Sequence, residues 1–237
     1  LRYAPGEIPS AASRLAVGLP DDLGLHQRCT DLLLAGPHAA CLRAAATGHH
    51  VAADIARLAS RTVFMCRQDD PRFDHLNRLP APLPQVCSVD RIPPQTSAWR
   101  TTLLSQLQHA SLPDTRWQPP PQFPSHEGGH RQRYVDQVHG QIRVRVLGVD
   151  RAVPLLMLHD VPGGCGSLLA LAEVMSRDRL VIAPDLPGLG ESHPLPYPSL
   201  GSYVTALVEL LEHLGHRSVD VFAAGLSGCF AVALAAR

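Results

Sequence analysis

The feature that most constrains the fold of this chain is a strand–turn–helix pattern near residue 225. Residues 219–224 are mostly apolar and include β-branched side chains, which predicts a buried strand, and the small and apolar residues of 229–236 predict a helix. Between the two, Gly225 and Gly228 bracket Ser227. Only residues with little side chain allow the limbs of a tight turn to approach each other. The pattern therefore predicts a strand that runs directly into a helix packed on the same sheet.

Ser227 is the one reactive side chain inside this turn, and its position suits a nucleophile elbow. In such an elbow the hydroxyl is lifted clear of the sheet edge, and the N–H groups at the start of the helix favour a nearby negative charge. The expected motif is G-x-S-x-G, and Cys229 stands in place of its last glycine. We expect Ser227 at the head of the helix with strained backbone dihedrals.

Composition excludes several classes of partner. The 21 basic and 21 acidic residues give a formal net charge of zero, and no block of like charge is present. Nucleic acid and an anionic membrane surface are therefore not expected partners. No apolar run reaches the roughly 18 to 20 residues that span a bilayer. None of the six cysteines forms a C-x-x-C pair, so we expect free thiols in a reducing, cytoplasmic compartment, with no metal and no cofactor.

Helices and strands alternate along the chain, which is the rhythm of an α/β fold with a parallel sheet. Prolines and glycines dominate residues 113–133 and predict a linker between a first domain, residues 1–112, and a second, residues 134–237. The alternative is a long surface loop within one domain. The predicted helices lie at residues 30–47, 51–59, 97–108, 167–175 and 200–214, and the predicted strands at residues 62–66, 85–89, 134–138, 141–146, 154–159, 180–183 and 219–224.

Three stretches of the second domain together resemble the first half of the α/β-hydrolase family. They are His159-Asp160-Val161-Pro162-Gly163, then Pro184-Asp185-Leu186-Pro187-Gly188-Leu189-Gly190-Glu191-Ser192, then Gly225-Leu226-Ser227-Gly228. They resemble the family's H-G-x-P-G loop, its D-x-P-G-x-G-x-S loop and its elbow, in the same order. The resemblance implies a mostly parallel sheet with helices on both faces. It also implies a serine hydrolase that acts on a small-molecule acyl or ester substrate.

The resemblance also implies roles at the elbow. Ser227 would attack the acyl carbonyl, and the backbone N–H groups of Gly228 and Val161 would donate to the resulting oxyanion. Asp160 stands where the family usually has glycine, which is a departure from the family's loop.

Three further polar residues in the matching stretches are expected to have structural roles. His159 is expected to fix its loop through hydrogen bonds rather than to transfer protons. Asp185 and Ser192 are expected to form the turns of a tight Gly/Pro loop.

A serine nucleophile needs a base that is oriented by an acid, and the family places both after the elbow. Instead, residues 30–110 resemble the family's second half. There, Asp70 is our choice for the acid, with Asp69 close behind, and an exposed turn is the alternative reading of both. Arg91 occupies the place of the catalytic histidine, and arginine cannot act as a base. His126 and His130 in the linker are the nearest replacements.

Two arrangements explain a second half that precedes a first half: a segment of a tandem protein, or a circular permutant. We favour the tandem because the sequence starts without methionine, ends inside a predicted helix and shows no replacement histidine. In either case we expect the strand at 62–66 to lie parallel to the strand at 219–224. The leading function is a serine hydrolase that is incomplete in this chain and has no useful esterase activity alone. The alternative is a non-catalytic, hydrolase-like unit used for binding or scaffolding. The oligomeric state stays open.

Overall fold

The computed structural model describes residues 21–70, 72–108 and 131–237. They divide into two compact units. Of the described residues, the first contains 21–25, 52–70 and 72–108, and the second contains 26–51 and 131–237. The expected linker at 113–133 lies almost entirely outside the described residues, and its last residues, 131–133, already belong to a strand.

The first unit is built on a two-stranded parallel sheet. Strand β1 (Thr62–Arg67) pairs with β2 (Cys87–Ile92) in a register that sets Thr62 opposite Cys87. The 3-10 helix η1 (Phe73–Arg78) lies between them in sequence, and α4 (Thr96–Gln108) follows β2. A parallel pair needs a crossover connection, which the chain from 68 to 86 supplies.

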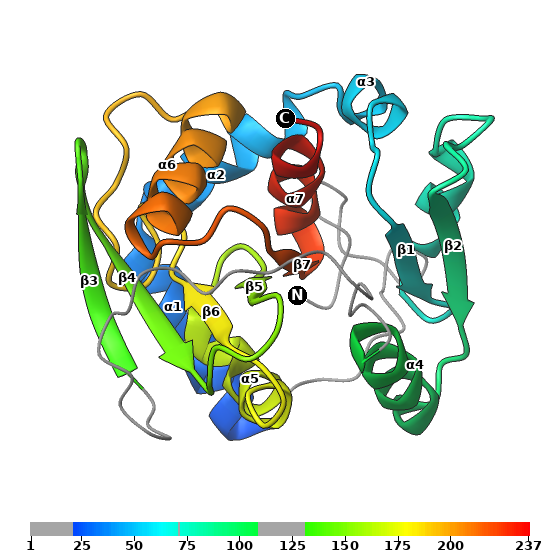
Figure 1. Ribbon diagram of the computed structural model, residues 1–237, viewed down its shortest axis with the longest axis horizontal. Helices are drawn as coiled ribbons and strands as arrows, with labels where there is room; N and C mark the ends of the chain where they lie inside the picture. Colours follow the sequence, from blue (N-terminus) through cyan, green and yellow to red (C-terminus); the bar gives the residue numbers. More distant parts are fainter. Residues whose placement is uncertain (1–20, 71, 109–130) are drawn as a thin grey trace. The chain divides into compact units, whose positions relative to one another are not determined.

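The second unit contains a five-stranded sheet in the order β3-β4-β6-β5-β7 (Figure 1). The two pairings at one end, β3 with β4 and β4 with β6, are antiparallel, and β5 is parallel to both β6 and β7. The fold is thus α/β with a mixed sheet, and the expectation of a mostly parallel sheet holds only for the three strands at the other end, β6, β5 and β7. The strands are β3 (Arg131–Gln137), β4 (Gly140–Leu147), β5 (Leu155–Leu158), β6 (Val181–Pro184) and β7 (Asp220–Ala223).

The connections of the parallel strands place helices on both faces of this sheet. The chain steps from β5 to β6 through η2 (Cys165–Leu168) and α5 (Leu169–Met175), and then back past β5 to β7 through α6 (Leu200–His213). Because parallel crossovers are right-handed, steps in opposite directions put α5 and α6 on opposite faces. Helix α7 (Gly228–Ala235) packs beside α6 (Figure 1), where the centroids of the Tyr203 and Phe230 rings lie 5.2 Å apart.

The second unit also includes helices from the start of the chain. The predicted helix at 30–47 is two helices, α1 (Asp22–Ala35) and α2 (His38–Thr47), because Gly36 adopts a positive φ of 50° and Pro37 follows it. Ala39, Leu42 and Ala46 of α2 are buried in the core with residues of β4, β5 and β6. Helix α3 (Val51–Ala56) lies across the division between the units.

The predicted pairing of residues 62–66 with 219–224 is wrong. Strand β1 pairs only with β2, and β7 pairs only with β5, among the residues that the structure describes. Of the described helices, none is both long and apolar enough to cross a membrane.

Candidate functional site

The carboxyl ends of β5, β6 and β7 meet at one edge of the sheet. Strand β5 is the point where the chain changes direction across the sheet, since β6 lies on one side of it and β7 on the other. Ligands of open α/β sheets bind beyond the carboxyl ends of the strands at such a point. The loops that begin at His159, Asp185 and Ala224 therefore form the candidate site.

The predicted tight turn follows β7, but its special backbone position is Gly225. Gly225 has a φ of 57°, in the left-handed region, and opens the 3-10 helix η3 (Gly225–Ser227). Ser227 immediately precedes α7, as predicted, but its φ of −65° and ψ of −13° are ordinary helical values. The strained dihedrals expected at Ser227 are therefore absent, and the residue at the sharpest point of the turn has no side chain.

Ser227 is fully buried rather than lifted clear of the sheet edge. Its exposed fraction is 0%, and its hydroxyl donates a hydrogen bond to the backbone carbonyl oxygen of His159. This bond ties the start of α7 to the end of β5. The expectation of an accessible Ser227 hydroxyl is not met, because the turn residue that faces the β5 loop lies two positions earlier.

The N–H of Gly228 is also engaged within the helix. It donates to the carbonyl oxygens of Gly225 and Leu226. The donor that the turn directs across to the β5 loop is instead the N–H of Leu226, the residue after Gly225.

One carboxylate oxygen occupies the point where the two loops meet. Oδ1 of Asp160 accepts a hydrogen bond from the N–H of Val161 at 2.7 Å and another from the N–H of Leu226 at 2.8 Å. The predicted donor Val161 thus faces the site, but an acceptor from its own loop already satisfies it. Two converging N–H groups on one anionic oxygen are the arrangement that oxyanion sites use.

His159 has the structural role expected of it. Its ring is fully buried, Nε2 accepts a hydrogen bond from the N–H of Leu186 at 3.0 Å, and Nδ1 lies 2.8 Å from the carbonyl oxygen of Asp160. These partners assign the proton to Nδ1. Burial lowers the pKa of His159, although the carbonyl of Asp160 opposes this, so the ring is neutral and holds the β5 loop against the loop after β6.

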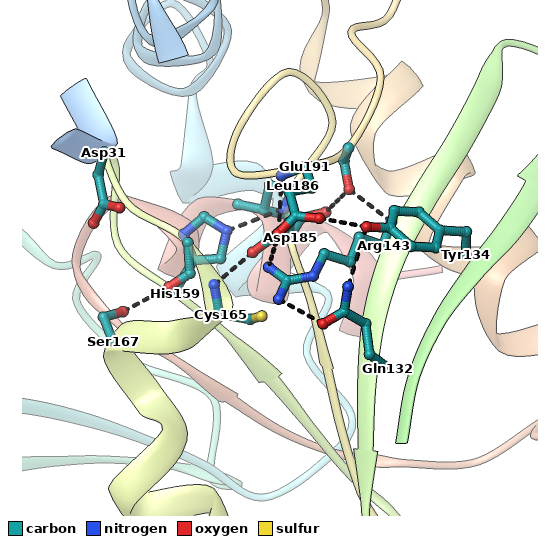
Figure 2. Close-up of polar contacts among 12 residues, drawn as sticks. Asp31, Gln132, Tyr134, Arg143, His159, Cys165, Ser167, Asp185, Leu186 and Glu191 are labelled. Atoms are coloured by element: carbon teal, nitrogen blue, oxygen red, sulfur yellow. Dashed lines mark hydrogen bonds and ion pairs between the residues drawn. The ribbon is translucent and has the colours of Figure 1, made fainter. Parts of the chain in front are cut away.

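Asp185 organises the loop after β6, as Figure 2 shows. Its fully buried carboxylate accepts the N–H of Cys165 at 2.6 Å and the N–H of Glu191 at 3.1 Å, and it pairs with Nη1 of Arg143 at 2.9 Å. Burial alone would raise the pKa of Asp185, but these donors together hold it below its ordinary value. Asp185 is therefore an ionised scaffold residue.

Two neighbours of Asp185 have structural roles as well. The Ser192 hydroxyl donates to the carbonyl oxygen of Asp185 at 2.8 Å and accepts the N–H of Arg143 at 3.0 Å, as expected of a turn-forming serine. Burial, with the Asp185 carboxylate beside it, raises the pKa of the Cys165 thiol to about 12, so this cysteine is not a nucleophile at neutral pH.

The residue predicted to supply the acid, and the arginine that stands in the place of the base, belong to the first unit. Oδ1 of Asp70 accepts the N–H of Arg72 at 2.8 Å, and Asp69 pairs with Arg67, so both aspartates stabilise the turn after β1. Nη2 of Arg91, on β2, donates to the side-chain oxygen of Asn77 at 3.1 Å. These contacts match the alternative reading of Asp70 as a turn residue. The candidates for the base, His126 and His130, lie outside the described residues.

Sequence reasoning missed the pairing of Asp160 with Gly225. A β-carbon built on Gly225 would lie 2.1 Å from Cγ of Asp160, so a side chain at 225 and the Asp160 carboxyl cannot occupy this space together. One signal was present: the small residues Ala223 and Ser227 stand two positions to either side of Gly225, so the same pattern can be centred on Gly225. Among the described residues, no group of three His, Cys, Asp or Glu side chains could hold a metal ion.

Comparisons with known proteins give partial similarities. No protein-family model matches the sequence, and no curated protein matches it either. A structure of the N-acyl homoserine lactonase AidH with N-hexanoyl homoserine is 30% identical over 46% of this chain and 41% of that chain, with a TM-score of 0.43. The epoxide hydrolase CorEH is 26% identical over 44% of this chain and 36% of that chain, with a TM-score of 0.40. Cfl2 from Burkholderia cenocepacia is 20% identical over 45% of this chain and 37% of that chain, with a TM-score of 0.43. The chain thus covers less than half the length of each of these structures.

Proposed function

We propose that residues 131–237 form an α/β-hydrolase-like unit that performs no serine-dependent acyl transfer and serves in binding or scaffolding. The observation that carries this proposal is the burial of Ser227, whose hydroxyl donates to the His159 carbonyl oxygen. A serine nucleophile must reach the acyl carbon and pass its proton to a base. The described contacts of Ser227 include no base.

The surrounding residues support the same proposal. The turn position that faces the β5 loop is Gly225, which carries no side chain to act as a nucleophile. The two N–H groups that would stabilise an oxyanion already bind Asp160. The arginine at 91 cannot replace a histidine as base, because it stays protonated at all ordinary pH values.

The competing proposal is the serine hydrolase of small acyl or ester substrates, with Ser227 as nucleophile. In its favour, the three matching stretches occur in the order of that family, and Val161 offers its N–H to the site. For this function Ser227 would have to leave its bond to His159 and Asp160 would have to leave the site. The first change breaks a buried hydrogen bond and the second breaks two partly buried ones, so we rank this function second.

Turnover of p-nitrophenyl acetate and p-nitrophenyl butyrate by the purified chain separates the two proposals. Wild type, Ser227→Ala and Ser192→Ala are compared, since Ser192 is a second buried serine whose hydroxyl donates to a backbone carbonyl. We expect all three rates to equal the rate in buffer. Turnover by wild type and by Ser192→Ala that disappears in Ser227→Ala would establish the serine hydrolase instead, because loss of a nucleophile costs orders of magnitude in rate.

A further inference from the structure

We infer that Asp160 is an internal ligand of an anion site, and that a small monocarboxylate such as acetate binds the site once that side chain is removed. The site consists of the N–H groups of Val161 and Leu226, which come from two different loops. This inference deepens the proposed function by stating why the hydrolase-like site is closed, and it rests on the same placement of the turn.

The geometry identifies the ligand as a carboxylate oxygen. Both N–H groups donate to the same atom, Oδ1 of Asp160, at 2.7 and 2.8 Å, which are the short distances of charge-assisted hydrogen bonds. Without that oxygen, two partly buried donors would lose their acceptor, which is unfavourable. A free carboxylate of similar size offers the same oxygen to the same two donors.

The space for the ligand exists because Gly225 has no side chain. An ideal β-carbon at Gly225 would lie 2.1 Å from Oδ1 and 2.4 Å from Oδ2 of Asp160. The carboxyl group therefore occupies the volume directly over the turn, where a longer side chain at 225 would project. Removing the group opens that volume and leaves the two donors aimed into it.

The second oxygen explains why wild-type protein would reject an anion. Oδ2 of Asp160 accepts no hydrogen bond from the residues that the structure describes, and the residue is partly exposed. An approaching carboxylate would meet this charge before it reached the two N–H groups. Because the Asp160 side chain competes for the two donors, the apparent affinity of the site for acetate is its intrinsic affinity multiplied by the fraction of time that the site is open.

Titration with acetate, followed through the backbone amide signals of Val161 and Leu226, tests the inference. In Asp160→Ala we expect both signals to move together and to saturate, over a range of acetate concentration in which neither signal of wild type moves. In wild type, and in Asp160→Asn, whose amide oxygen still accepts from both donors, we expect neither signal to move. Sodium chloride at equal ionic strength is the control for general salt effects.

Two results would overturn the inference. Saturable movement of both amide signals in wild type would show that Asp160 does not close the site, and a folded Asp160→Ala whose signals ignore acetate would show that there is no anion site. If Asp160→Ala does not fold, scalar coupling across the hydrogen bonds in wild type decides: coupling of both amide nitrogens to Cγ of Asp160 supports the internal ligand, and its absence refutes it. None of these readouts depends on ester turnover, so this inference and the proposed function can fail separately.

Discussion

A β-carbon on Gly225 would lie 2.1 Å from Cγ of Asp160, so the side chains of these two positions exclude each other. Gly225 belongs to the turn after β7, and Asp160 to the loop after β5. The identity of one residue therefore constrains the other, although 65 residues separate them in the sequence (225 minus 160).

Gly225→Ala should destabilise the protein strongly. The positive φ of 57° costs an L-residue about 1–2 kcal/mol, and displacing Asp160 breaks two charge-assisted hydrogen bonds of about 1.5–3 kcal/mol each, for a total of about 4–8 kcal/mol. In an Asp160→Ala background only the backbone cost should remain. A double-mutant cycle by urea denaturation should thus give a coupling energy of about 1.5 kcal/mol or more.

Gly228→Ala is the matched control for this cycle. Gly228 has a φ of −54°, and an added β-carbon would meet no atom within 4 Å. Alanine at this position should be neutral or stabilising by up to about 1 kcal/mol. Equal losses of stability from Gly225→Ala in both backgrounds would refute the coupling.

The ion pair of Arg143 and Asp185 should be essential for stability. Arg143→Met leaves the carboxylate of Asp185, whose exposed fraction is 0%, without its guanidinium partner. Breaking a buried pair in this way costs about 3–5 kcal/mol. Urea denaturation checks the value, with Arg237→Met as control, because the Arg237 side chain makes an exposed 3.3 Å hydrogen bond to Thr205. Similar losses for both variants would contradict the assigned role of Asp185.

Stability should fall as the pH drops below about 6.5, the ordinary pKa of histidine. Burial lowers the pKa of His159 in the folded protein, so the unfolded chain binds a proton that the folded chain refuses. The stabilisation that comes from the neutral ring is fully present above the pKa of the histidine in the unfolded chain. It is lost on acidification, by up to about 1.4 kcal/mol per pH unit for each such histidine. Burial of His216, partly opposed by Asp150, lowers its pKa and acts in the same direction.

Urea denaturation at about pH 7.5, 6.5 and 5.5, which lie above, at and below that pKa, checks this prediction. Loss of the Leu186 amide signal reports on the second unit, because that amide binds Nε2 of His159. His159→Gln should flatten the pH dependence, and His139→Gln, at an exposed position, should not. An unchanged slope in His159→Gln would contradict the neutral, buried ring.

Local sequence patterns predicted the elements of this fold well. The alternation of helix and strand, the hairpin near Gly140 and the strand–turn–helix at 219–236 all occur within a few residues of the expected positions. Pairing between distant strands was harder, because an apolar strand carries no label for its partner. The wrong pairing of residues 62–66 with 219–224 came from the resemblance of the two halves. The antiparallel strands β3 and β4 at one end of the sheet reduced its parallel part.

The site was predicted only in part. His159, Asp185 and Ser192 have the structural roles expected from a tight loop, since their buried polar groups need partners nearby. Which glycine opens the turn could not be read from spacing, because Gly225 and Gly228 both fit a tight bend. Three-dimensional contact decides it, through the approach of Asp160 to Gly225.

Labelling of the purified chain with a fluorophosphonate, followed by peptide mass spectrometry, tests the central claim most directly. The reagent modifies serines that act as nucleophiles, whereas the buried hydroxyl of Ser227 donates to the His159 carbonyl oxygen. We predict that the peptide with Ser227 stays unmodified in the folded protein, as in Ser227→Ala. Stoichiometric modification of Ser227 would contradict the account and identify it as the nucleophile of a serine hydrolase.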